Sequence, residues 1–275
     1  MTLAMIGVDL DGTMLGGTAG RYGFLPAGID ALRFFVKEHQ GQVAIVTGRD
    51  IASIEKLLEM EGIGAEEGWP HVIIAEERYI YHLHERSYIA EEKWNRSIHE
   101  TERKHFEDIR RGVNELLADQ LAQLTPGSRR VEGEVEEQRG YVELLFTSPE
   151  AARRGEAVAL EWLRRHQLPY TTIRNVKGVS VRHRDVGKGQ LLRKVCETLD
   201  IPPSCVLAVG DSANDLSMLD GSNGFLSAAP GNADMEVQAA VRQSGGYIAN
   251  GTCGDGVAEA VYHFLQPVRT GASKN

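Results

Sequence analysis

The chain has 275 residues, of which 42% are hydrophobic and 25% are charged, an ordinary composition for a soluble globular protein of one or two domains. Its net charge of −9 argues against nucleic acid or an anionic membrane surface as the main partner. No stretch approaches 18 apolar residues, so the sequence predicts no membrane span.

The cysteines and the N-terminus predict a cytoplasmic protein. Cys196, Cys205 and Cys253 are odd in number and lack metal-ligand spacing, which is typical of reduced, packed residues. The first apolar run has no basic region before it and is interrupted at once by Asp9, so it is not expected to be a signal peptide.

The first segment alternates predicted strands and helices. Apolar runs at 5–8, 43–47 and 71–75 are typical of buried parallel strands. Helical spacing begins at Pro26 and again after the GRD sequence that follows the second run. This order predicts a parallel βαβαβ unit.

Between residues 81 and 183 this parallel alternation stops. The predicted elements are, in chain order, a charged helix at 91–124, strands at 129–135 and 141–146, a helix from Pro149 to before Pro169, and a hairpin at 170–183. Such an order predicts an α+β unit inserted into the first domain. The predicted division is therefore a core of residues 1–80 and 184–275 and an inserted domain of residues 81–183.

From Val186 onward the alternation returns. We expect a helix from Lys188 to about Leu199, strands at 206–210 and 224–227, a helix at about 256–265 and a frayed tail at 267–275. The predicted fold class is α/β, with a parallel-sheet core and an inserted α+β domain.

Two aspartates directly follow the first predicted strand. Asp9 and Asp11 precede Gly12 and Thr13. Ligands bind at the carboxyl ends of parallel strands, and adjacent carboxylates there suit a hard cation such as Mg²⁺. Because Asp-Gly is also a strong turn signal, a solvated turn is the alternative at this point.

Three further sets of residues lie at predicted strand ends or helix starts. Each has a structural alternative: Thr47, before Gly48, could cap a helix; Lys188 could be a solvated lysine in a first helical turn, although the helix dipole opposes a cation there. Asp211 and Asp215 could be acids at a helix start, but they repeat the strand-then-carboxylate pattern of Asp9. Two such strand ends side by side would make one acidic metal site.

In this order, DLDGT, TGR, an isolated lysine before a helix and GDSANDLSML resemble the four motifs of the haloacid dehalogenase-like (HAD) phosphohydrolases. The likeness covers both core segments nearly end to end. The insertion resembles the C2-type cap of the Cof-like and sucrose-phosphatase-like branch, and VGKGQLL and NGTCGDGVAEAVYHF resemble the sucrose-phosphatase-like enzymes. The resemblance implies a three-layer, Rossmann-like core with an inserted C2-type cap.

The resemblance also implies roles for these residues. Asp9 would be the nucleophile that forms an aspartyl-phosphate, and Asp11 would act as general acid and base. Mg²⁺ would be bound by Asp9, Asp11 (through its backbone carbonyl), Asp211 and Asp215 (through water or in support). Phosphoryl oxygens would be held by Thr47, Gly48, Lys188 and Asn214.

The implied function is that of a Mg²⁺-dependent phosphomonoesterase for a sugar phosphate, with sucrose phosphate or a related glycosyl phosphate as the substrate. An acid at Asp11 fits phosphatases and phosphomutases, whereas transport ATPases carry Thr there. A phosphomutase and a catalytically silent sugar-phosphate-binding regulator are the alternatives. The expected partner is a small phosphorylated substrate, and the expected assembly is a monomer or a small homo-oligomer.

One departure from the family lies after the third strand, where Cof-like relatives usually have Asn-Gly and this chain has Glu76, Glu77 and Arg78. The departure favours the sucrose-phosphatase-like branch. In the cap, Trp94 is a candidate for stacking on a sugar, but packing within the cap is the preferred interpretation. Arg174, Lys177 and Arg182 are further candidates for setting substrate specificity, but solvated positions are preferred for them. Surface positions rather than metal ligation are expected for His82, His84, His99 and His105.

Overall fold

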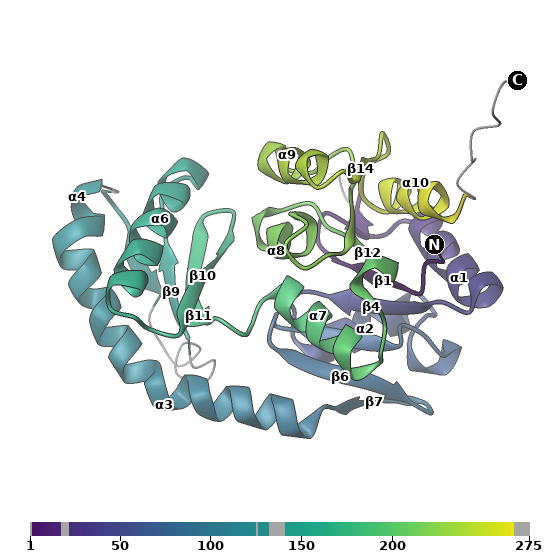
Figure 1. Ribbon diagram of the computed structural model, residues 1–275, viewed down its shortest axis with the longest axis horizontal. Coiled ribbons are helices and arrows are strands. Elements are labelled where there is room, and N and C mark those ends of the chain that lie inside the picture. The colour runs from purple at the N-terminus through teal and green to yellow at the C-terminus, as the bar shows by residue number, and fades with distance from the viewer. Residues whose placement is uncertain (1, 18–21, 125, 132–140, 267–275) are drawn as a thin grey trace, which may run out of the picture.

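A computed structural model describes residues 2–17, 22–124, 126–131 and 141–266 (Figure 1). Its larger domain contains one eight-stranded sheet, in the order β14-β13-β12-β1-β4-β5-β6-β7. The bounds are β1 Met5–Val8, β4 Gln42–Val46, β5 Val72–Ala75, β6 Tyr79–His84, β7 Ser87–Ala90, β12 Val206–Val209, β13 Leu226–Ala229 and β14 Tyr247–Ile248. The strands from β14 to β5 are parallel; β6 pairs antiparallel with β5, and β7 pairs antiparallel with β6.

Helices cover both faces of this sheet and make a three-layer core. Helices α1 (Pro26–His39), α2 (Ile51–Met60) and α10 (Cys253–Leu265) contribute to one buried cluster. Helices α7 (Lys188–Thr198), α8 (Leu216–Leu219) and α9 (Met235–Gln243) contribute to the other. In β1, Ile6 and Val8 belong to the first cluster and Met5 to the second, so the period-two alternation of a strand serves both layers.

The smaller domain is an α+β cap. Its antiparallel sheet has the order β10-β11-β9-β8, with β8 Arg129–Val131, β9 Val142–Leu145, β10 Tyr170–Asn175 and β11 Gly178–His183. The long α3 (Glu92–Leu116) and α6 (Pro149–Arg165) pack against it around a separate apolar cluster that includes Phe106 and Leu144. A π-helical turn at Leu117–Leu121 and α4 (Ala122–Leu124) extend α3.

The predicted fold class is confirmed, because the core is mainly parallel and the cap is antiparallel. The core sheet continues to Ala90, so the boundary predicted between residues 80 and 81 falls inside β6. The physical reason is a short turn after β5, which keeps β6 paired with its neighbour in the sheet. Part of the strand predicted at 129–135, and the tail predicted at 267–275, lie outside the described residues.

Shorter elements complete the molecule. A two-stranded ribbon pairs β2 (Leu15–Gly16) with β3 (Gly23–Phe24), and 3₁₀ turns lie at Ala65–Glu67, Pro203–Cys205 and, as η4, Ala213–Asp215. Across the described ranges, we find no helix long and apolar enough to cross a membrane.

Candidate active site

Three adjacent parallel strands bring the predicted site residues together. In β1, Val8 pairs with Val209 of β12 on one side and with Ile45 of β4 on the other. The segments that follow these strands therefore leave the sheet at the same edge, as expected for a ligand site of an open α/β sheet. Asp9 follows β1, and Thr47 follows β4.

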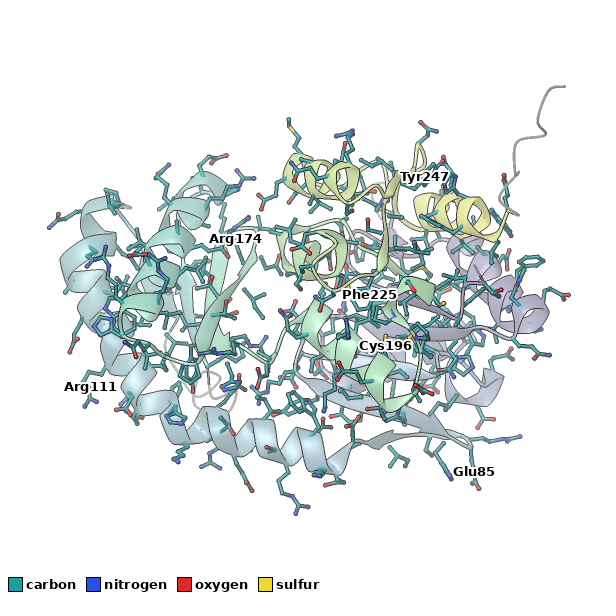
Figure 2. All side chains as sticks on the ribbon, in the orientation of Figure 1. Glu85, Arg111, Arg174, Cys196, Phe225 and Tyr247 are labelled. Carbon is teal, nitrogen blue, oxygen red and sulfur yellow. The ribbon has the colours of Figure 1, made fainter. Side chains whose placement is uncertain are left out.

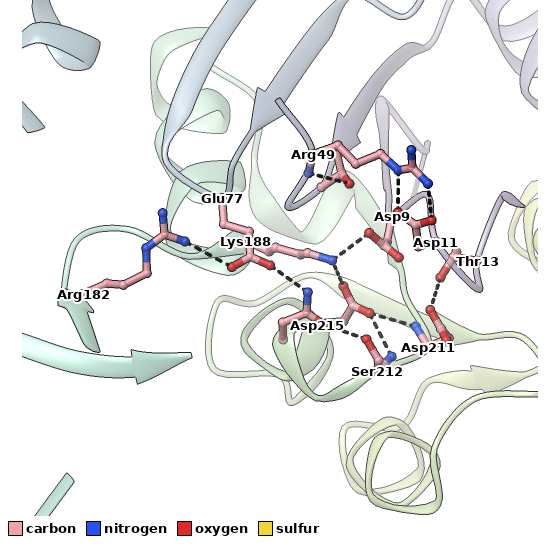
Figure 3. Close-up of polar contacts among 12 residues, drawn as sticks. Asp9, Asp11, Thr13, Arg49, Glu77, Arg182, Lys188, Asp211, Ser212 and Asp215 are labelled. Atoms are coloured by element: carbon pink, nitrogen blue, oxygen red, sulfur yellow. Dashed lines mark hydrogen bonds and ion pairs between the residues drawn. The ribbon is translucent and has the colours of Figure 1, made fainter. Parts of the chain in front are cut away.

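Lys188 lies at the centre of this edge (Figure 3). Its side chain is 1% exposed, and its Nζ donates to Asp9 Oδ1 at 2.7 Å and to Asp215 Oδ1 at 2.6 Å. Burial alone would lower the pKa of Lys188, but the charges of Asp215 and Asp9 outweigh it and raise the pKa. The interpretation of Lys188 as a solvated lysine is therefore wrong, and this ammonium group stays charged at neutral pH.

Asp9, Asp211 and Asp215 form an acidic cluster in which one oxygen of each lies within 4.8 Å of the others. Burial raises the pKa of Asp9 well above its ordinary value despite the opposing charge of Lys188. Burial and the charge of Asp215 raise the pKa of Asp211 to about 6. Within the described ranges, this is the one group of three acidic, histidine or cysteine side chains spaced to hold a metal ion.

The possible metal ligands of the cluster suit Mg²⁺, since all are hard carboxylate oxygens. Asp215 Oδ2 accepts from the backbone N–H groups of Asp211 and Ser212, both at 2.9 Å, so both of its oxygens have donors. Thr13 Oγ1 donates to Asp211 Oδ1 at 2.8 Å. Gly12 has a φ of +82°, and a Cβ there would lie 2.3 Å from Asp211 Oδ2, so only glycine leaves space for this carboxylate.

The side chain of Asp11 has different partners from that of Asp9. Arg49 binds it with two hydrogen bonds, Nε to Oδ2 at 2.7 Å and Nη2 to Oδ1 at 2.6 Å, and Tyr22 Oη donates to Oδ1 at 2.9 Å. Burial raises the pKa of Asp11, but these hydrogen bonds outweigh it and hold the pKa below its ordinary value. Sequence reasoning did not include Arg49 among the site residues, although its place in TGR was a signal.

Thr47 is buried and does not cap α2. The N-cap is Asp50, whose Oδ1 accepts from the Ser53 N–H at 2.9 Å, so the capping interpretation of Thr47 is wrong. Thr47 Oγ1 accepts from the Arg49 N–H at 3.3 Å. Its neighbour Gly48 lies beside Glu77, since a Cβ on Gly48 would be 3.7 Å from Glu77 Oε1.

Asn214 is held at both ends of its amide. Its Nδ2 donates to Glu77 Oε1 at 2.7 Å, and its Oδ1 accepts from Ser212 Oγ at 2.6 Å. Glu77 in turn lies 3.5 Å from Nη1 of Arg182, which comes from β11 of the cap. Glu77 was not among the predicted site residues; the departure from Asn-Gly at its turn was the available signal.

The predicted cap candidates differ in their surroundings. Arg174 and Arg182 are buried, so the preference for solvated positions is wrong for both, whereas Lys177 is exposed as expected. Trp94 donates from Nε1 to the Arg78 carbonyl at 3.0 Å and packs against the core cluster, not within the cap. Trp94 is thus a packing residue, as the preferred interpretation held, but it packs against the core and not within the cap.

Comparisons with known proteins agree with this arrangement. A sucrose-phosphatase from Synechocystis sp. PCC6803, solved with sucrose and phosphate, superimposes with a TM-score of 0.70 at 19% identity and covers 97% of this chain and 100% of its own. A haloacid dehalogenase-like hydrolase from B. subtilis superimposes with a TM-score of 0.59 at 20% identity, covering 96% of this chain and 100% of its own. At these identities, the likeness establishes the fold alone.

Curated sequences give more local matches. A phosphoglycolate phosphatase from Methanothrix thermoacetophila is 35% identical over 106 residues, which are 38% of this chain and 45% of the relative. A 5-amino-6-(5-phospho-D-ribitylamino)uracil phosphatase from Bacillus subtilis is 33% identical over 106 residues, 38% of this chain and 40% of the relative. The matches thus span less than half the length of these curated relatives.

The decisive comparison covers nearly the whole chain. A family profile described as Sucrose-6F-phosphate phosphohydrolase matches residues 2–265. Both core segments and the complete cap lie within the match. The chain therefore belongs to the sucrose-6F-phosphate phosphohydrolase family of HAD-like phosphatases.

Proposed function

We propose that this chain is a Mg²⁺-dependent phosphomonoesterase that hydrolyses a sugar phosphate through an aspartyl-phosphate on Asp9. The observation that carries the proposal is the buried contact of Lys188 with Asp9 beside the acidic cluster. A carboxylate next to a fixed ammonium group and a cation site can approach an anionic phosphate, because the positive charges offset the repulsion.

The metal would be held by Asp9, Asp211 and the backbone carbonyl of Asp11. Asp215, whose oxygens already accept three hydrogen bonds, would support the site by orienting Lys188 and the loop of Asp211. When bound, Mg²⁺ supplies charge that screens the nucleophile from the phosphate and stabilises the transition state.

The reaction has two displacements at phosphorus. In the first, an oxygen of Asp9 bonds to phosphorus while the bond to the leaving oxygen breaks, and Asp11 gives that oxygen a proton. In the second, Asp11 takes a proton from water, the water oxygen bonds to phosphorus, and the bond to Asp9 breaks. Inorganic phosphate leaves, and both aspartates return to their starting states.

The phosphoryl oxygens need donors in both steps. Lys188 supplies a fixed charge, the Thr47 hydroxyl and the Gly48 N–H supply short donors, and Asn214 supplies its second amide N–H. Thr47 and Lys188 are each 1% exposed, so these two donors are already withdrawn from water before a substrate arrives. Such preorganised groups stabilise charge better than mobile ones.

Asp11 must carry a proton to act as an acid, although Arg49 lowers its pKa in the resting site. A phosphate dianion competes with a carboxylate for a guanidinium group, since both accept bidentate hydrogen bonds. We infer that substrate draws Arg49 away from Asp11, whose pKa then rises towards the working pH.

A cavity between cap and core supports a polar leaving group. It has a volume of about 230 Å³ and lies between β10 and the α8 region, with Asn214 in its wall. Its other polar side chains are Glu156, Thr171, Thr172, Arg174, Gln190, Ser217 and Asp220. Arg174 is paired with Glu156 at 2.7 Å and with Glu236, and the wall offers hydroxyl, amide and carboxylate groups suited to sugar hydroxyls.

The free cysteines support a reducing, cytoplasmic location, since disulfides form mainly in oxidising compartments. The proposed partner is a small phosphorylated molecule.

A substrate screen tests the proposal. The protein is incubated with Mg²⁺ and phosphorylated mono- and disaccharides, including sucrose 6-phosphate, and released phosphate and sugar products are measured. Phosphate release from a sugar phosphate supports the phosphatase. Isomerisation without release would indicate the phosphomutase, and binding without either reaction would indicate the silent regulator.

A further inference from the structure

The turn between β5 and β6 has an unusual backbone. Glu76 has a φ of 53° and Glu77 a φ of 55°, so two consecutive glutamates adopt the left-handed conformation. Asn-Gly is the preferred pair in such turns, because a larger side chain is strained there. Strained residues of this kind persist where the surrounding structure requires them, and they concentrate at functional sites.

The backbone of Glu77 connects two segments of the site. Its N–H donates to the Thr47 carbonyl at 3.0 Å, and its carbonyl accepts from the Gly187 N–H at 2.9 Å. Gly187 directly precedes Lys188, so Glu77 lies between the segments that carry the hydroxyl and the ammonium group. The side chain of Glu77 therefore extends from a position between these two segments of the site.

The side chain of Glu77 is only 7% exposed, and it contacts Asn214. The 2.7 Å hydrogen bond from Asn214 Nδ2 to Oε1, together with the Ser212 contact at the other end, fixes the plane of the Asn214 amide. One N–H of Nδ2 donates to Glu77. Because the plane of the amide is fixed, the direction of the second N–H is fixed as well. Without Glu77, the amide could rotate about its terminal torsion, which has a broad energy profile.

The cap supplies the counter-charge for Glu77. Arg182 on β11 is 4% exposed; its Nη1 lies 3.5 Å from Glu77 Oε2, and its Nη2 donates to the Glu76 carbonyl at 2.9 Å. A buried carboxylate is costly unless it is paired and hydrogen-bonded. A cap residue thus supplies the opposite charge beside the Glu77 side chain (Figure 3), which contacts Asn214 through its other oxygen.

We propose that Glu77 is a positioning residue, which holds the Asn214 amide towards the phosphoryl group and is itself held by Arg182 of the cap. This inference rests on the proposed function, because it takes Asn214 as a phosphate-binding residue. The cap then completes the phosphate site in the core, in addition to covering the leaving group.

The test is a double-mutant cycle on phosphate binding. Glu77→Gly, Asn214→Ala and the double variant are compared with the wild type by calorimetric titration with inorganic phosphate in the presence of Mg²⁺. Glycine suits a φ of 55°, so the variant removes the side chain without adding strain. Glu76→Gly is the matched control, with the same charge change in the same turn.

We expect Glu77→Gly and Asn214→Ala each to weaken phosphate binding about tenfold, the effect of one lost hydrogen bond to an ionised group. The double variant should be no weaker than Asn214→Ala alone, because Glu77 acts through that amide. Glu77→Gln retains an acceptor oxygen for Asn214 and should bind phosphate within about threefold of the wild type. Glu76→Gly should bind as the wild type does.

Additive losses in the double variant, or an equal loss in Glu76→Gly, would overturn the positioning role and leave the phosphatase proposal intact. Activity of the wild type on sugar phosphates is measured in parallel. A wild type that binds phosphate but hydrolyses no ester would refute the proposed function, while the binding cycle would still decide the role of Glu77. A wild type that binds no phosphate would refute both.

Discussion

The ammonium group of Lys188 lies between Asp9 and Asp215, and all three side chains are nearly inaccessible to water. Lys188→Met keeps most of the side-chain volume but leaves two buried carboxylates without their cation. Breaking a buried ion pair in this way costs about 3–5 kcal/mol, because the remaining charge is uncompensated. We expect the free energy of unfolding in metal-free buffer to fall by about this amount, measured by urea titration at pH 7.5.

Lowering the pH provides the matched check on that prediction. Burial raises the pKa of Asp9, and its protonation would remove the repulsion, so the deficit of Lys188→Met should shrink as the pH falls towards 5. A variant as stable as the wild type at pH 7.5 would show that Lys188 does not balance these charges.

The raised pKa of Asp211 predicts that Mg²⁺ binding depends on pH. Its pKa of about 6 in the folded, metal-free protein is above its ordinary value of 3.8, so between these values the folded state binds a proton that the unfolded state does not. Acid in this window therefore favours the metal-free folded state and competes with Mg²⁺. We expect the Mg²⁺ affinity, measured by calorimetry, to fall about tenfold per pH unit below pH 6.

Thr13→Val offers a control for the pH effect. The Thr13 hydroxyl lowers the pKa of Asp211 through its 2.8 Å hydrogen bond, so its removal should move the loss of Mg²⁺ affinity to higher pH. An affinity that is flat from pH 5 to pH 7.5 in both proteins would contradict a role for Asp211 in holding the metal.

At the scale of single elements, the segment between β4 and α2 separates capping from phosphate binding. Asp50 caps the helix, and Thr47 lies three residues earlier, buried at the strand end. We expect Asp50→Ala to lower the free energy of unfolding by about 1 kcal/mol with little change in phosphate affinity. Thr47→Ala should do the reverse, lowering kcat/KM with a smaller effect on stability. Equal effects of the two variants on kcat/KM would contradict this division.

The parallel strands and the residues at their ends could be predicted from the sequence, because both depend on local patterns. Short apolar runs predicted β1, β4, β5 and β12, and the residues after them met at one edge since parallel strands share a direction. Helix α3 was predicted from its apolar spacing. The predicted helix ends at Leu124, and the π-helical turn and α4 extend α3 to that residue.

The contacts of Arg49 and Glu77 could not be predicted in the same way. Arg49 meets Asp11 across 38 residues, and Glu77 meets Asn214 across 137. Only the folded chain brings such pairs together. For the same reason, solvated positions were predicted for Arg174 and Arg182, whereas each is buried against carboxylates from other elements. The antiparallel extension of the core sheet by β6 and β7 was not predicted, because the turn before β6 contains two glutamates and lacks the usual Asn-Gly signal.

At the scale of the whole molecule, charged contacts join the cap to the core. Arg174 lies on the side of β10 that faces the core (Figure 2), and it pairs with Glu236 of α9. Arg153 of α6 pairs with the same Glu236 at 2.9 Å. These contacts hold the cap beside the polar cavity, so they should matter most for substrates that fill it.

Glu236→Gln tests this contribution of the cap. We expect KM for the preferred sugar phosphate to rise several-fold, while kcat/KM for p-nitrophenyl phosphate, a small ester, changes by less than about twofold. Glu197→Gln, which removes the exposed ion pair with Arg193 on α7, serves as the control and should change neither. Equal losses on both substrates would show that Glu236 acts on the core and not through the cap.

In the proposed reaction, Asp9 attacks the phosphate of a sugar phosphate. This step is tested most directly by phosphate release from the best substrate of the screen, with Mg²⁺, in the wild type, Asp9→Asn and the surface control Asp30→Asn. We expect Asp30→Asn to be as active as the wild type, and Asp9→Asn to bind phosphate but lose turnover by at least about 10³-fold, since an amide cannot serve as the nucleophile. Turnover by Asp9→Asn at the wild-type rate, or no release by any of the three proteins, would contradict this role of Asp9.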